Sequence, residues 1–181
     1  MKNVLYFLVF SLFLLSACNS ETATSEESNT TAEAIDVPEP TNNTVEIPST
    51  LDDLYNPNSA IFRGLNFGMS ADQVKGTESG EFVSEEEGMQ VYSVDLNEIT
   101  FADIEYKYAE GALQRIRVDI FADNPTQAQS LGDDLTALFN EKYLARETLW
   151  DAREGDQDYT AFMEVIADED TPGVVIIYEL L

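Results

Sequence analysis

The chain has 181 residues, of which 35 are acidic and 9 basic, so its formal net charge is −26. Such a charge repels nucleic-acid phosphates and anionic lipid head groups, which argues against a nucleic-acid partner. The chain contains no histidine and a single cysteine, so histidine-dependent chemistry and an intrachain disulfide are both excluded.

The N-terminus is typical of a secretory signal peptide. A brief basic start with Lys2 precedes an apolar run over residues 4–15. That run is too short to span a bilayer, because a spanning helix needs about 20 apolar residues. Small residues then lead to the single cysteine, in the order Leu15-Ser16-Ala17-Cys18. Residues 1–17 are therefore predicted to be a signal peptide.

Residues 15–18 resemble the lipobox of bacterial lipoproteins at all four positions. The resemblance implies cleavage between Ala17 and Cys18, a diacylglyceryl group on the Cys18 thiol, and a location in the bacterial cell envelope. Two acyl chains anchor a protein stably where one holds it only marginally, so the membrane is an expected partner. Asn19 favours the outer membrane over the inner, by resemblance to proteobacterial sorting. The alternative is an ordinary cleaved signal peptide with a chance cysteine at its end.

Residues 18–60 are expected to form a lipidated, disordered acidic tether. Ser, Thr, Asn, Glu and Pro dominate this stretch, which has too few apolar residues to offset the entropy of ordering. A flexible chain of about 40 residues has an r.m.s. end-to-end distance of roughly 35 Å, so it would hold a domain away from the membrane. One exception is predicted at residues 50–55, where Thr50 and Asp53 favour a single helical turn before Pro57.

Residues 61–181 have the size of one compact domain, whose first half predicts a short helix and then antiparallel strands. Ser70 and Gln73 form a capping box that starts a helix over residues 71–76. The predicted strands cover residues 81–84, 89–96, 99–109 and 113–122.

The register of the last two of these strands follows from their side-chain pattern. A two-residue loop would place Tyr106 opposite Arg115, which mixes apolar and charged side chains on both faces of the sheet. A three-residue loop pairs Tyr106 with Ile116 and leaves Lys107, Arg115 and Arg117 on the outer face. A half-buried sheet needs one apolar and one polar face, so the second register is predicted.

The second half predicts a longer helix and three further strands. Asn124 and Pro125 open the helix, Gln127 supports its cap, and apolar residues recur on one side at helical spacing. The predicted strands cover residues 147–152, 159–167 and 173–180. Three of their aromatic residues are expected in the core: Trp150, Phe162 and Tyr178.

The order of these elements predicts an α+β fold, in which an antiparallel sheet has its helices packed on one face. Each half reads as a helix followed by antiparallel strands. The chain is therefore expected to contain two α-β-β-β repeats whose sheets join under the helices.

The sequence LNFGMSADQV, residues 65–74, resembles the opening of the small outer-membrane lipoproteins of the SmpA/OmlA type, a component of the β-barrel assembly machinery. It also resembles the opening of the secreted β-lactamase inhibitor proteins. The resemblance implies that Gly68 permits a turn, Met69 packs beneath the helix and Ser70 caps it. It extends to the fold and an envelope setting, but Gly76 ends the helix sooner than in those families, and no partner-binding residue is carried over.

No sequence motif for a specific reaction is present, so no catalytic, cofactor or metal site is predicted. The abundant carboxylates leave two alternatives open, a small hydrolase using paired carboxylates and a ligand-binding module. Asp168, Glu169 and Asp170 offer oxygen atoms of the kind that calcium binds, as do Asp156 and Asp158. Neither loop has the spacing of an EF-hand, and a plain polar turn is favoured for each.

A basic patch is predicted on the outer face of one hairpin, formed by Lys107, Arg115 and Arg117. In so acidic a protein such a patch favours docking to an acidic partner or a lipid head group. The alternative is charge balance against the carboxylates of Asp103, Glu105 and Asp119. The sequence as a whole predicts a non-catalytic envelope lipoprotein that binds another envelope protein.

Overall fold

The structure is a computed structural model that describes residues 51–52, 54–55, 61–96, 100–146 and 149–181. The predicted signal peptide (residues 1–17), Cys18 and residues 19–50 of the predicted tether lie outside the described residues. The lipid anchor therefore stays a prediction.

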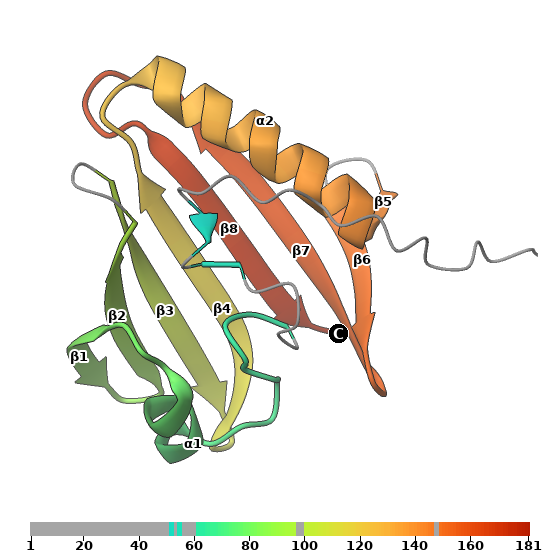
Figure 1. Ribbon diagram of the computed structural model, residues 1–181. Coiled ribbons are helices and arrows are strands. Elements are labelled where there is room, and N and C mark those ends of the chain that lie inside the picture. Colours follow the sequence, from blue (N-terminus) through green and yellow to red (C-terminus); the bar gives the residue numbers. More distant parts are fainter. Residues whose placement is uncertain (1–50, 53, 56–60, 97–99, 147–148) are drawn as a thin grey trace, which may run out of the picture. The chain divides into compact units, whose positions relative to one another are not determined.

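One eight-stranded antiparallel sheet dominates the described residues (Figure 1). Its strands are β1 (Glu81–Glu86), β2 (Met89–Asp95), β3 (Phe101–Ala109), β4 (Ala112–Phe121), β5 (Leu144–Arg146), β6 (Leu149–Glu154), β7 (Gln157–Ile166) and β8 (Gly173–Leu180). Two helices accompany the sheet, α1 (Ala71–Thr77) and α2 (Pro125–Lys142). The prediction of an α+β fold is wrong. The fold is β-rich, because the strands of both halves merge into one sheet beside helices of only 7 and 18 residues.

Each half of the sheet is a meander of four strands that follows one helix. The strands lie in the order β1-β2-β3-β4-β8-β7-β6-β5, so the antiparallel pairing of β4 with β8 joins the halves. Each predicted repeat has three strands, whereas each half of the sheet has four. In the second half the missed strand is β5, which has three residues and begins directly after the helix cap at Tyr143, with no Gly or Pro to mark a turn.

Both helices begin where their capping sequences predict. At α1, Ser70 Oγ accepts a hydrogen bond from the Gln73 backbone N–H at 3.3 Å, and Gln73 Oε1 accepts one from the Ser70 N–H at 2.9 Å. At α2, Asn124 Oδ1 accepts one from the Gln127 N–H at 3.0 Å. Each bond satisfies a backbone donor that the helix itself leaves without a partner.

Helix α2 covers one face of the sheet over β7 and β8 (Figure 1). Its buried side consists of Ala128, Leu131, Gly132, Leu135, Leu138 and Phe139. The helix approaches β7 so closely at Gly132 that a Cβ atom there would lie 2.3 Å from Cγ2 of Val165. A residue without a side chain is therefore needed at this crossing.

The predicted register of β3 and β4 is confirmed. Tyr106 lies opposite Ile116, and the charged pairs Lys107–Arg115 and Glu105–Arg117 lie on the other face. The apolar residues of both strands thus share one side of the sheet, as a half-buried sheet requires.

The loop between β3 and β4 is shorter than predicted. The chain turns in two residues, Glu110 and Gly111, whose φ angles of 54° and 80° are those of a tight hairpin turn. The ladder then pairs Tyr108 with Leu113 before it shifts, so that Gln114 is left as a bulge. The bulge adds the residue that the turn lacks and restores the predicted register.

Residues 51, 52, 54 and 55 belong to the folded part, and we term them the N-terminal turn. The backbone N–H groups of Leu54 and Tyr55 both donate to the Leu51 carbonyl at 2.9 Å, which is the single helical turn that the sequence predicts. The side chains of Leu51 and Leu54 are fully buried, and the Tyr55 hydroxyl lies 3.1 Å from that of Tyr178. The expected start of the domain at residue 61 therefore leaves out residues that belong to the folded part.

The core lies between the sheet and a layer formed by α2, the N-terminal turn and residues 61–67. Phe139 in the last turn of α2 has its ring centroid 5.2 Å from that of Trp150, and the Phe62 centroid lies 5.6 Å from that of Tyr178. Trp150 also donates from its indole N–H to Asn140 Oδ1 at 2.9 Å. Trp150 and Tyr178 are thus core residues, as predicted.

Candidate interaction surface

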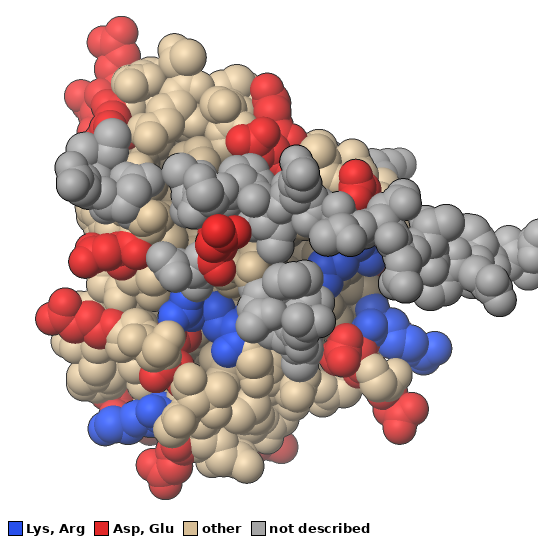
Figure 2. Space-filling view, in the orientation of Figure 1, with Lys and Arg blue, Asp and Glu red and all other residues tan. Residues whose placement is uncertain are grey.

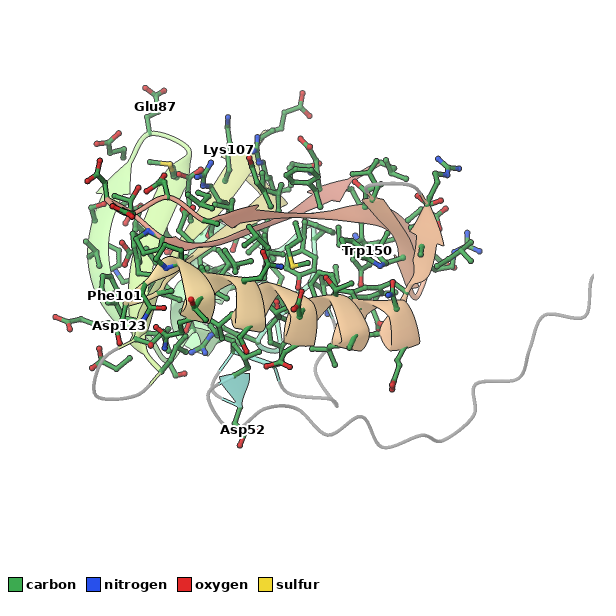
Figure 3. The ribbon with its side chains drawn as sticks, turned by 90° about the horizontal axis from the view of Figure 1, so that it is seen from above. Asp52, Glu87, Phe101, Lys107, Asp123 and Trp150 are labelled. Atoms are coloured by element: carbon green, nitrogen blue, oxygen red, sulfur yellow. The ribbon has the colours of Figure 1, made fainter. Side chains whose placement is uncertain are left out.

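The face of the sheet opposite α2 carries no helix in the part of the chain that the structure describes, and we term it the open face. Because side chains alternate along a strand, every second residue of each strand points to it. Figure 3 shows Lys107 on this side of the sheet and α2 on the other, with Trp150 between the helix and the sheet. The opposite, helix-bearing side carries acidic side chains spread over its described surface (Figure 2).

The open face carries apolar side chains that are only partly buried. Phe101, which is 41% exposed, stacks on Phe121 with ring centroids 4.6 Å apart. A second row runs across three strands through Ile177, Phe162 and Leu149, which lie opposite one another in turn. The expectation that Phe162 is a core residue is therefore wrong, because its position in β7 directs it to the open face. Apolar side chains left partly exposed on one face are typical of interaction sites.

A groove of about 280 Å³ lies on the open face between β4 and β7. Phe121, Ile166 and Val175 contribute its apolar lining, and Gly173 lies between them on β8. A Cβ atom at Gly173 would stand 2.4 Å from the carbonyl oxygen of Ile120, so no larger residue fits there. The glycine leaves a gap in the row of side chains, and this gap contributes to the groove.

The structure places all three residues of the predicted basic patch on the open face, but their environments differ. Arg117 binds Asp119 with both of its contacting nitrogens, Nε to Oδ2 at 2.8 Å and Nη2 to Oδ1 at 2.8 Å. These hydrogen bonds raise the pKa of the Arg117 guanidinium above its usual range, against the opposing effect of burial. Arg117 therefore pairs with a carboxylate of its own strand, which is what the charge-balance alternative expects.

Lys107 and Arg115 form no such contact, although Glu179 lies directly opposite Arg115 on β8. They lie directly opposite each other on β3 and β4, and neither forms an ion pair with any described residue. The Nε atom of Arg115 is buried and has no hydrogen-bond partner among the described groups. Two adjacent cations thus stand at one end of the open face.

Three of the carboxylates considered from the sequence, those of Asp119, Asp158 and Asp168, are engaged in local contacts. Asp103 faces Asp119 across β3 and β4, but Asp119 is bound by Arg117. Asp168 Oδ1 accepts hydrogen bonds from the backbone N–H groups of Asp170 and Thr171, at 3.0 and 2.7 Å, as in a plain polar turn. Asp158 pairs with Arg153 at 2.8 Å. Within the described ranges, no three metal-binding side chains lie close enough to hold an ion.

A buried ion pair on the helix side was not predicted from the sequence. Glu78, whose side chain is fully buried, accepts bonds from Arg63 at 2.7 and 3.1 Å, from the Gly80 N–H at 2.7 Å and from the Tyr106 hydroxyl. Burial raises the Glu78 pKa, but these bonds lower it by more, so the carboxyl has a pKa below its usual value. The signal in the sequence is Arg63 itself, a lone charge within the apolar residues 61–67.

Comparison with protein families, with curated proteins and with solved structures returned no match. The resemblances to the lipobox and to the small outer-membrane lipoproteins therefore stay predictions. Neither helix in the described residues combines the length and apolarity needed to cross a membrane.

Proposed function

We propose that this protein is a lipid-anchored component of the bacterial cell envelope whose folded domain binds another protein through the open face. The observation that carries the binding role is the partly buried apolar surface of the open face, over which no described helix lies. The sequence of residues 15–18 supports the anchor, and Asn19 favours the outer membrane.

The chemistry of the open face supports binding rather than catalysis. The chain has no histidine, and its one cysteine is the predicted site of lipid attachment. The opposed carboxylates of Asp103 and Asp119 do not form a free acid pair, because Arg117 binds Asp119 through both oxygens. Aromatic side chains and arginines on one surface are instead typical of a protein interface.

The Cys18→Ser variant is expected to leave the membrane fraction or to accumulate as unprocessed precursor. Serine has no thiol to carry the diacylglyceryl group, and the two acyl chains supply the stable anchoring. Cell fractionation with immunoblotting, together with metabolic labelling by palmitate, measures both effects.

A matched control restores a cysteine two residues away, as Ser20→Cys in the Cys18→Ser background. This variant should stay unlabelled, because the thiol no longer follows the lipobox sequence. Palmitate labelling of Cys18→Ser itself would contradict the proposed anchor.

The binding role predicts that the open face is protected from solvent in the native envelope, which oxidative footprinting measures.

A further inference from the structure

Lys107 and Arg115 differ from the other basic side chains in the described residues. Arg63, Arg117, Arg146 and Arg153 each form an ion pair. Lys75 and Lys142 lie over the rings of Phe82 and Tyr143, each with Nζ 5.1 Å from the ring centroid. Lys107 and Arg115 have neither kind of partner among the described residues, although the chain holds 35 acidic residues.

The two cations lie directly opposite each other on neighbouring strands, so they repel each other. Like charges directly opposite each other on neighbouring strands destabilise a sheet. The Arg115 Nε is in addition a buried donor without an acceptor, which is uncommon in native proteins. A carboxylate brought by a partner cannot reach the buried Nε, but it would relieve the repulsion between Lys107 and Arg115 and bind the terminal nitrogens of the guanidinium with charge-assisted hydrogen bonds.

The groove offers a second, chemically different contact. Its volume of about 280 Å³ lies below the range of roughly 300–1,000 Å³ that is typical of small-molecule pockets, and it suits one large side chain. Apolar anchors that fill such hollows dominate the energetics of protein interfaces. Phe121, Ile166 and Val175 supply the apolar contact.

The cation pair and the groove lie at a fixed distance from each other along β4. The first site is charged and the second is apolar. Arg115 and Phe121 are six residues apart on β4, which corresponds to about 20 Å along a strand. Asp119 lines the groove and Asp103 lies opposite it, so a partner's acidic group is disfavoured there. At the other end of β4 two cations, Lys107 and Arg115, stand beside the single carboxylate of Glu179, so an acidic group is favoured there over the groove.

We infer that the open face binds an acidic segment of a partner protein at these two points. Carboxylates of the partner contact Lys107 and Arg115, and a large apolar side chain about 20 Å away enters the groove beside Phe121. This inference rests on the proposed function and specifies the chemistry of the partner.

Two other occupants fit the open face less well. An anionic membrane surface would bring lipid phosphates against Asp103 and Glu164, which share this face with the cation pair but lie away from it. A second copy of the chain carries the same net charge of −26, so the two copies repel each other. A partner with its acidic groups confined to one end of the contact avoids both penalties.

The test places a photo-cross-linking benzoylphenylalanine at Phe162 of the full-length protein in its native cells. Phe162 lies on the open face in the row next to that of the cation pair. The double reversal Lys107→Glu/Arg115→Glu is compared with the matched control Lys75→Glu/Lys142→Glu, which changes the net charge equally and places both substitutions on the helices, away from the open face. Thermal melting of the purified variants confirms that each is folded.

The inference predicts a discrete protein adduct that the open-face reversal reduces at least about tenfold and the control reversal leaves unchanged. The cross-linked partner peptide, identified by mass spectrometry, should contain Asp or Glu and a large apolar residue. A synthetic copy of that peptide should bind the purified protein. Replacing its Asp and Glu residues by Asn and Gln should weaken this binding about as much as the open-face reversal does. Ile166→Arg, which fills the groove with a charged side chain, should also weaken it.

The possible failures separate the two proposals. Absence of any adduct at Phe162 would overturn the proposed binding function and this inference with it. A protein adduct that persists in Lys107→Glu/Arg115→Glu, or a cross-linked peptide without acidic residues, would overturn only the inference. An adduct with lipid would assign the face to the membrane surface, and an adduct with a second copy would assign it to self-association.

Discussion

The Glu78→Gln variant is expected to lose about 3–5 kcal/mol of unfolding free energy, as buried ion pairs do when one partner is removed. The Arg63 side chain is only 9% exposed and its guanidinium binds the fully buried Glu78 carboxylate. The substitution removes the negative charge that stabilises the guanidinium in this setting. Denaturant unfolding of both proteins at neutral pH measures the difference.

Glu81→Gln is the matched control, because Glu81 is an exposed carboxylate only three residues further along the chain. It should change the stability by no more than about 0.5 kcal/mol, as most surface substitutions do. Equal losses in the two variants would mean that the Arg63–Glu78 pair does not hold the fold together.

The contribution of Glu78 is expected to depend on pH. The pKa of its carboxyl in the folded state lies below the usual value of 4.5, so the native state favours the ionised form. The stability gained is complete above the unfolded-state pKa and is lost as the pH falls through the lower folded-state pKa. The difference between wild type and Glu78→Gln should therefore shrink below about pH 4.5. A difference that stays constant down to pH 2 would contradict this assignment.

The Ile116→Ala variant is expected to lose about 2–5 kcal/mol, which is the usual cost of truncating a fully buried aliphatic side chain. Ile116 is fully buried on β4 between Tyr106 of β3 and Tyr178 of β8. Removal of its side-chain atoms leaves a cavity that these two rings cannot fill without moving. Thermal or denaturant unfolding measures the loss.

The neighbouring Arg115→Ala is the control, since Arg115 points to the open face. Its effect should be about 0.5 kcal/mol or less, because the substitution also relieves repulsion from Lys107. If Arg115→Ala proved as destabilising as Ile116→Ala, the register of β3 and β4 would be wrong.

Features set by neighbouring residues were predictable from the sequence. The capping side chains of Ser70 and Asn124 act within three residues, so they fix where α1 and α2 begin. The hairpin register follows from alternation of side chains on two adjacent strands. The range of β8 was likewise predicted, because its apolar run is bounded by a clear turn sequence.

Features that depend on distant residues were not predictable in this way. The composition of residues 18–60 does not indicate that Leu51 and Leu54 are buried in one core cluster with residues of α2 and the sheet. Glu78 binds a residue 15 positions earlier in the chain, and no local pattern specifies that pairing. The fold class was wrong for a related reason, since the merging of both halves into one sheet depends on the pairing of β4 with β8.

The open face is the part of the candidate site that the sequence predicted least well. Its basic residues were identified from the sequence. The pairing of Arg117 with Asp119 was not, although the two residues lie two positions apart on one strand and point to the same face. Phe162 was expected in the core because an aromatic residue in a strand is usually buried. Its outward direction became clear only from its pairing with Ile177 and Leu149.

Oxidative footprinting of phenylalanines tests most directly whether the open face binds a protein. Phe101 on the open face and Phe82 on β1 are 41% and 43% exposed, while Phe139 is fully buried. In the purified protein Phe101 and Phe82 should therefore be oxidised at similar rates, and Phe139 should be protected. In intact native envelopes we expect Phe101 and Phe162 to become protected while Phe82 stays reactive. Equal oxidation of Phe101 and Phe162 in the purified protein and in the envelope would contradict a protein-binding role for the open face.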